Sequence, residues 1–187
     1  MNVITTGFEG LVIIEPRVHE DSRGYFFESF NLESFLEAGI NFSPVQDNES
    51  RSSRGVIRGL HYQTGDKAQG KLCQVITGRV LDIAVDIRFG SSSFGKYIAL
   101  ELSGENHKQL WIPPGFAHGF SVLSDYAVFL YKCTNFYSKE HERTIIYNDP
   151  KLKIDWGIEN PVISEKDLNG KSFDEIERDF VYSEMKI

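Results

Sequence analysis

The stretch Val80-Leu81-Asp82-Ile83-Ala84-Val85-Asp86-Ile87-Arg88-Phe89 alternates between two kinds of side chain. Every second residue from Leu81 to Ile87 is a large aliphatic, and the residues that alternate with them include Asp82, Asp86 and Arg88. Successive side chains of a β-strand point to opposite faces, so this period of two predicts a strand. We expect it to form a hairpin with residues 74–76 through the turn Thr77-Gly78.

Short strand-like segments continue on both sides of this stretch. They are separated by Gly, Pro, Ser, Asn and Asp, which are typical of turns. A chain of short strands at such spacing predicts an all-β sandwich or jelly-roll barrel. The predicted strands cover residues 11–14, 25–27, 97–102, 109–112, 119–123 and 127–134.

Helical signals are few and lie mainly near the end of the chain. Asn31 is placed to cap a short helix that ends at Gly39, with Leu32, Phe35 and Leu36 on one face. Ser164 and Ser172 each precede an acidic residue by three positions, a spacing typical of capping boxes. We therefore expect one domain over 1–187, in which 160–187 form a C-terminal helical extension.

Composition narrows the class of protein. The 187 residues carry a formal charge of −7, which disfavours general binding to nucleic acid or to an anionic membrane. Cys73 and Cys133 are too few for a secreted disulfide framework, so reduced packing residues are expected. No signal peptide or long apolar run is evident, which favours a cytoplasmic protein.

Two segments carry residue types that do chemistry. Arg58-Gly59-Leu60-His61-Tyr62-Gln63 is followed by Lys71, and Pro113-Pro114-Gly115-Phe116-Ala117-His118 resembles the second half of a cupin motif. Metal-binding cupins resemble His-x-His in their first half, whereas this chain has His61-Tyr62-Gln63. The ligand set is incomplete, so we expect no metal. Asp82 would be costly in a dry lumen, which predicts a hydrogen-bonded interior.

Each of these residues also has a purely structural interpretation. A histidine between Leu60 and Tyr62 is often only a hydrogen-bonded core residue, and the aromatics of 129–137 often fill a core or an edge. Arg23 and Arg58 are, taken alone, typical of solvated surface arginines.

Taken together, the segments resemble the dTDP-4-dehydrorhamnose 3,5-epimerase family over nearly the whole chain. The segments that carry the resemblance, in family order and approximate spacing, are Arg23-Gly24-Tyr25-Phe26-Phe27-Glu28, Gln46-Asp47-Asn48, Arg58-Gly59-Leu60-His61, Lys71, Pro114-Gly115-Phe116-Ala117-His118-Gly119 and Leu130-Tyr131-Lys132. The resemblance implies a metal-free cupin jelly roll, without cofactor, that acts as a homodimer with shared active sites. The implied substrate is a dTDP-linked 4-keto-6-deoxysugar, and the implied pathway is dTDP-L-rhamnose biosynthesis for surface polysaccharides.

By the same resemblance, His61 is the base, Tyr131 the acid on the opposite sugar face and Lys71 the donor to the C4 oxygen. Asp167 is the carboxylate that orients His61. The implied substrate contacts are Arg23, Glu28, Gln46, Asp47, Asn48, Arg58, His118, Glu142 and Lys166. Phe26 and Tyr137 are suited to stack on thymine, and Asp82 is added from the polar strand face.

Chemistry supports these residue types independently. Inversion of a carbon requires a base on one face and a proton source on the other. An imidazole has an unperturbed pKa of ~6.5, near working pH. An ammonium beside a developing enolate oxygen lowers the barrier by a few kcal/mol, and arginine suits diphosphate.

Three other functions remain open. The chain is also consistent with an epimerase that inverts only C3, with a metal-dependent cupin oxygenase or isomerase, and with a sugar-binding cupin without catalysis.

Overall fold

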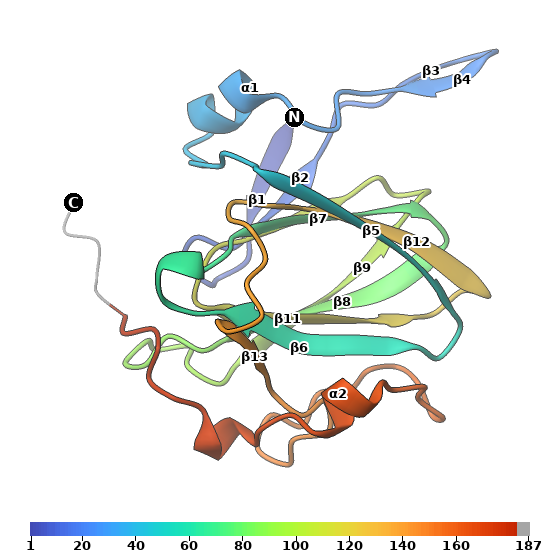
Figure 1. Cartoon of the computed structure of the whole chain (residues 1–187). Helices are drawn as coiled ribbons and strands as arrows, with labels where there is room; N and C mark the ends of the chain where they lie inside the picture. Colours follow the sequence, from blue (N-terminus) through green and yellow to red (C-terminus); the bar gives the residue numbers. More distant parts are fainter. Residues whose placement is uncertain (183–187) are drawn as a thin grey trace.

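The computed structural model describes residues 1–182 and consists mainly of antiparallel strands arranged in two facing sheets (Figure 1). The six-stranded sheet has the order β1-β2-β10-β7-β12-β5, and the five-stranded sheet has the order β13-β6-β11-β8-β9. The strands of the six-stranded sheet are β1 (Asn2–Thr5), β2 (Val12–Glu15), β5 (Gln46–Ser53), β7 (Lys71–Thr77), β10 (Gln109–Ile112) and β12 (Tyr126–Cys133). The strands of the five-stranded sheet are β6 (Ile57–Gln63), β8 (Arg79–Asp86), β9 (Tyr97–Ser103), β11 (Phe116–Val122) and β13 (Glu142–Thr144). The all-β jelly-roll class expected from the sequence is confirmed.

The alternation in β8 separates two cores. Val80 and Ala84 face the space between the sheets, where they pack with aromatic residues such as Phe120 and Phe129. Ile83 and Val85 belong to a second cluster on the other face of the five-stranded sheet. Both faces of β8 are therefore buried, and the space between the sheets is largely apolar.

The predicted hairpin around Thr77-Gly78 is wrong. Strand β7 pairs with β10 and β12, whereas β8 pairs with β11 and β9, so Gly78 marks a crossing from one sheet to the other. Gly78 has a φ of 82°, and a Cβ there would lie 2.1 Å from the carbonyl oxygen of Tyr126. A tight glycine turn can connect two strands of one hairpin or two strands of different sheets, and the sequence around the turn does not distinguish these cases.

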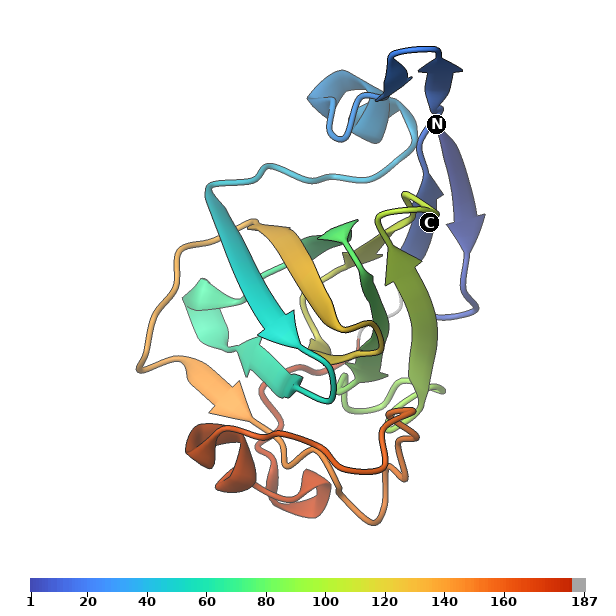
Figure 2. The same ribbon diagram turned by 90° about the vertical axis from the view of Figure 1, so that its right-hand side faces the viewer.

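The C-terminal segment forms a layer against the five-stranded sheet (Figure 2). Ile145, Leu152 and Trp156 are buried there together with Phe173, so the layer starts before residue 160. It contains helix α2 (Glu165–Leu168) and the 3-10 turn η2 (Phe173–Glu175). Ser164 and Ser172 cap these elements as expected, but most of the layer is irregular, and 183–187 lie outside the described residues.

The N-terminal region adds two outlying elements (Figure 1). A two-stranded hairpin of β3 (His19–Asp21) and β4 (Gly24–Phe26) projects from the body. Helix α1 (Leu32–Glu37) is capped by the Asn31 side chain, which accepts from Ser34 N–H, as predicted. Phe35 is buried, but Leu32 and Leu36 are 43% and 51% exposed. The remaining element is the 3-10 turn η1 (Gly65–Lys67). No helix of residues 1–182 has the length and apolarity needed to span a membrane.

Candidate active site

A cavity of about 130 Å³ opens between strands β5, β6, β7 and β12. Seven of the residues selected from the sequence line it. They are Gln46, Asn48, His61, Lys71, Tyr131, Tyr137 and Glu142. Because these residues come from distant parts of the chain, only the fold brings them together.

His61 is held by Asp167 from the C-terminal layer. Its Nε2 lies 2.6 Å from Oδ1 of Asp167, whose carboxylate is 4% exposed. The second oxygen, Oδ2, accepts from the Gly59 N–H at 3.3 Å. Although burial works to raise the pKa of Asp167, the His61 and Gly59 hydrogen bonds hold that pKa below its ordinary value. An ionised carboxylate therefore fixes the orientation of the imidazole.

Tyr131 and Lys71 approach the same cavity from neighbouring strands. Burial raises the pKa of Tyr131 to about 12, so its phenol keeps its proton at neutral pH. Lys71 Nζ lies 3.4 Å from the His61 carbonyl oxygen and 5.7 Å from the centre of the Tyr131 ring. The ammonium thus lies close to both His61 and Tyr131. This arrangement supplies a base, a proton source and a cation to one small space.

A polar network forms the rim of the cavity. Tyr137 donates its hydroxyl to Glu142 at 3.0 Å, and Lys166 forms an ion pair with the same carboxylate. Burial works to raise the pKa of Glu142, but these two partners keep it lowered. On the other side, the side-chain oxygen Oε1 of Gln46 accepts from the Tyr137 N–H, and Nε2 of the same amide donates to Asn48 Oδ1. The rim residues are therefore ordered by one another.

Asp82 and His118 lie beneath the cavity lining rather than in it. His118 is directly opposite His61 in the strand pairing, and its Nε2 is 2.7 Å from Oδ1 of Asp82. Asp82 is 0% exposed and its Oδ2 has no hydrogen-bond partner among the described residues. Burial lowers the pKa of His118, opposed by Asp82. In this conformation Asp82 is placed to act on His118 rather than on a ligand.

Cys73 adds a third ligand type to this buried pair. Its Sγ lies 3.7 Å from His118 Nε2. His118 Nε2 and Asp82 Oδ1 lie 2.7 Å apart, which is a hydrogen-bond distance. A nitrogen and an oxygen that both bind one tetrahedral metal ion lie farther apart than this. Burial also raises the pKa of Cys73, which keeps the thiol protonated. The group therefore fits a hydrogen-bonded cluster better than a metal centre.

Two further predicted contacts lie beside the cavity. Arg58, on the same strand as His61, donates from Nε to Ser52 Oγ at 3.0 Å. Asp47 points to the exposed face of β5 and pairs with Lys132 at 2.8 Å. Strand alternation explains this placement, since Gln46 and Asn48 occupy the inward positions on either side of Asp47.

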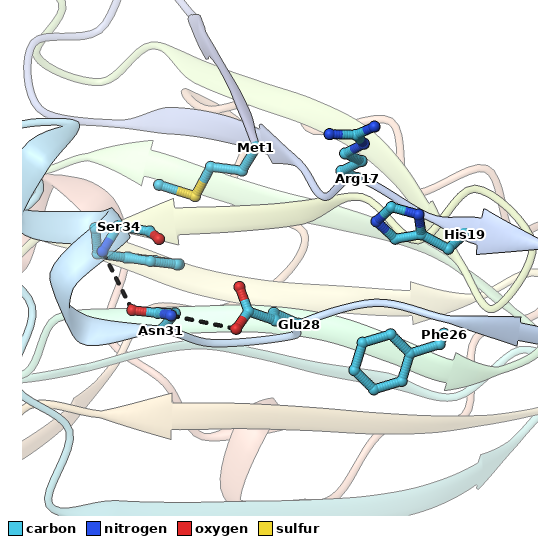
Figure 3. Close-up of a pocket in the computed structure, with 8 residues that line it drawn as sticks. Met1, Arg17, His19, Phe26, Glu28, Asn31 and Ser34 are labelled. Carbon is cyan, nitrogen blue, oxygen red and sulfur yellow. Dashed lines mark hydrogen bonds between the residues drawn. The ribbon is translucent and has the colours of Figure 1, made fainter.

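The N-terminal predicted residues form a separate group. Phe26 and Glu28 line a hollow of about 290 Å³, together with Arg17, His19 and Asn31 (Figure 3). Glu28 accepts from the Asn31 amide, and Phe26 is 69% exposed. Arg23, on the hairpin, forms an ion pair with Asp21, and its side chain is 88% exposed. The structure therefore does not bring these three residues to the cavity of their own chain.

Three residues that line the cavity were not predicted from the sequence: Tyr62, Gln63 and Gln69. Gln63 lies two residues after His61 on the same strand, so the period of two was a signal for it. Gln69 follows η1 in an irregular loop, where no periodic pattern indicates which side chains face inward.

Comparison with known proteins gives a consistent result. The family model of dTDP-4-dehydrorhamnose 3,5-epimerase matches residues 5–175. An enzyme of that name from Pseudomonas aeruginosa is 58% identical over 165 residues, covering 87% of this chain and 91% of the relative. One from Shigella flexneri is 54% identical, with 92% and 96% covered. A Legionella pneumophila epimerase, solved with dTDP-4-keto-L-rhamnose, superposes with a TM-score of 0.93 at 49% identity, with 97% and 98% covered.

Proposed function

Because this chain belongs to the dTDP-4-dehydrorhamnose 3,5-epimerase family, we propose that it carries out the family reaction in the cavity between His61 and Tyr131. The enzyme is an isomerase that inverts C3 and C5 of dTDP-4-dehydro-6-deoxy-D-glucose and yields dTDP-4-dehydro-L-rhamnose. The reaction is a step in dTDP-L-rhamnose biosynthesis. The observation that supports the site assignment is the shared cavity of His61, Lys71 and Tyr131.

His61 removes the proton next to the C4 ketone. Its Nε2 is engaged by Asp167, and among residues 1–182 Nδ1 has no hydrogen-bond partner. Nδ1 is therefore the nitrogen that is free to accept the proton. The Asp167 carboxylate stabilises the imidazolium that forms. The electrons of the broken C–H bond pass into an enolate whose negative charge lies largely on the C4 oxygen.

Lys71 and Tyr131 complete the exchange. The Lys71 ammonium stabilises the enolate oxygen, an effect of a few kcal/mol for one well-placed donor. Tyr131 then delivers its proton to the opposite face of the carbon, which inverts the centre. Because burial raises the pKa of Tyr131 to about 12, the phenol is protonated when the enolate forms. Between the two inversions the His61 imidazolium releases its proton to solvent and the Tyr131 phenolate takes one up, after which the same residues act on the second carbon.

Substrate binding involves the rim and the layer below it. Gln46, Asn48, Tyr137, Glu142 and Lys166 surround the mouth of the cavity. Arg58 is suited to the diphosphate because its fork matches phosphate oxygens. Asp82 and His118 act from below by fixing the shape of the sugar pocket, while Asp47 lies on the outer face of β5 and contributes through Lys132.

The enzyme works as a homodimer that shares its active sites. Support comes from the N-terminal group: Arg23, Phe26 and Glu28 lie away from the cavity of their own chain, on or next to a hairpin that projects from the body. Exposed Phe26 and Leu36 offer an apolar surface that a second copy would cover. In this arrangement the hairpin of one protomer completes the nucleotide end of its partner's site. A reducing cytoplasm suits the two free, buried cysteines.

The test is turnover of the 4-keto substrate in deuterated water. Inversion through an enolate places one solvent deuteron on each inverted carbon, so product with deuterium at C3 and C5 is expected. Deuterium at C3 alone would identify a single-site epimerase. Product without solvent deuterium would contradict the proton-transfer mechanism.

A further inference from the structure

We propose that Gln63 is a positioning residue for substrate binding, because its amide fixes the segment that carries Tyr137 over the cavity. This inference rests on the proposed function, in which Tyr137 contacts the substrate. It concerns a residue that lies on the same strand as His61, two positions later.

The Gln63 amide bonds to both neighbours of Tyr137. Its Nε2 donates to the Phe136 carbonyl at 3.1 Å, and its Oε1 accepts from the Ser138 N–H at 2.6 Å. A carbonyl and an N–H that flank one residue are the groups that a strand offers to a neighbouring strand. The side-chain amide thus replaces a strand partner at a point where the backbone is irregular.

A third hydrogen bond anchors the amide itself. Nε2 also donates at 2.7 Å to the carbonyl of Lys67, the last residue of η1, and Gln63 is only 4% exposed. Two donor hydrogens and the acceptor oxygen are therefore all used within the protein. Gln63 consequently has little capacity left for a ligand, and its effect on substrate passes through Tyr137.

Tyr137 depends on such support because little packing holds it. Its side chain is 54% exposed, and its fixed points are the Tyr137 N–H to Gln46 and the hydroxyl to Glu142. An exposed aromatic that is already ordered binds a flat ligand without first losing rotamer and backbone freedom. Without the Gln63 hydrogen bonds, the substrate must order Tyr137 when it binds, and its affinity falls.

The decisive variants are Gln63→Met and Gln63→Glu. Methionine keeps the length and removes all three hydrogen bonds, whereas glutamate keeps the acceptor for Ser138 N–H and loses the two donors. We expect Gln63→Met to raise KM for the sugar nucleotide roughly three- to tenfold and to weaken calorimetric binding of dTDP by a similar factor, with kcat nearly unchanged. Gln63→Glu should raise KM at least as much, because an ionised carboxylate oxygen would face the Lys67 and Phe136 carbonyl oxygens that the amide nitrogen binds.

Two comparisons separate positioning from general loss of structure. In a Tyr137→Ala background, Gln63→Met should raise KM no further, because the side chain that it positions is gone. Thr64→Val removes a neighbouring bond to the His141 carbonyl, which does not flank Tyr137, and should leave KM unchanged.

Failure of the inference is distinct from failure of the proposed function. A wild-type KM in Gln63→Met, or KM increases that multiply in the double variant, would overturn the role of Gln63 while wild-type turnover continues. Absence of epimerisation in wild type and Thr64→Val would instead reject the proposed function. If Gln63→Met does not fold, Gln63→Glu and its double variant decide the question.

Discussion

His61 Nε2 and Asp167 Oδ1 lie 2.6 Å apart although 106 positions separate the two residues in the sequence. The contact joins strand β6 to the short helix α2, so in the proposed mechanism the C-terminal layer orients the base in addition to covering the sheet.

Asp167→Asn should therefore lose activity without losing the fold. The amide keeps the shape but cannot stabilise the imidazolium, so we expect kcat to fall by on the order of 10²–10⁴-fold. Steady-state kinetics measure the loss, and dTDP affinity reports whether the site is intact. Glu165→Gln, on the same helix, removes an exposed charge and should retain kcat. Equal kcat values for the two variants would refute the role of Asp167.

Tyr131→Phe should separate deprotonation from inversion. The base remains, so in deuterated water the recovered substrate should gain deuterium while little epimer forms. In His61→Ala the same exchange should cease, although dTDP still binds. Tyr126→Phe, an exposed tyrosine on the same strand, is the matched control and should turn over normally. Normal epimer formation by Tyr131→Phe would require a different acid.

His118 predicts a loss of stability on mild acidification. Because burial lowers its pKa, the unfolded chain, with a pKa near 6.5, binds the proton at a higher pH than the folded protein does. The contribution of neutral His118 to the free energy of unfolding is complete above pH 6.5, and it is lost as the pH falls from there to the lowered pKa of His118. Asp82, Cys73, Lys71 and His61 are the titratable groups around it.

Urea unfolding between pH 8 and about pH 5 measures this effect through the free energy of unfolding. His118→Asn should flatten the profile over that range, whereas His19→Asn, at an exposed position, should leave it unchanged. A wild-type slope in His118→Asn would contradict the assignment to this imidazole.

Gly78→Ala should destabilise the fold strongly. The residue has a positive φ, which costs an L-residue about 1–2 kcal/mol, and its Cβ would lie 2.1 Å from the Tyr126 carbonyl oxygen. Gly90 has a similar φ of 90°, and a Cβ there would have no atom within 4 Å. The stability lost in Gly90→Ala therefore measures the cost of the positive φ alone. Chemical denaturation should show a larger loss for Gly78→Ala, and equal losses would mean that the turn relaxes freely.

Shared active sites predict complementation between inactive variants. His61→Ala and Arg23→Ala would each disable every site of their own homodimers. Equal mixing with subunit exchange forms hybrids in which one site carries both changes and the other neither, so about a quarter of all sites should be intact. Sedimentation measures the dimer and turnover measures the recovery. A mixture no more active than its components would place Arg23 and His61 in the same chain's site.

Local patterns predicted what local physics determines. The alternation of Ile83 and Val85 identified β8, and Asn31 identified the start of α1, because side-chain periodicity and capping depend on near neighbours. Strand β5 was missed as a strand because its residues, Gln46–Ser53, are polar and one face is solvated. The wrong hairpin at Gly78 has a different origin, since the choice of sheet is a long-range property.

Site residues were selected through resemblance more than through pattern. The pairing of His61 with Asp167 and the separation of Arg23 from both depend on the completed fold, which periodicity does not encode. Gln63 shows the opposite case, since alternation from His61 indicated its inward direction but not its three hydrogen bonds.

The position of Asp167 in the chain has a consequence during synthesis. A nascent polypeptide that has emerged as far as β13 already contains every strand of the two large sheets. It still lacks Asp167, whose carboxylate contacts His61. Residues beyond β13 also cover the second apolar cluster of the five-stranded sheet, so the burial of that sheet and the contact between Asp167 and His61 are completed only when the C-terminal layer has been translated.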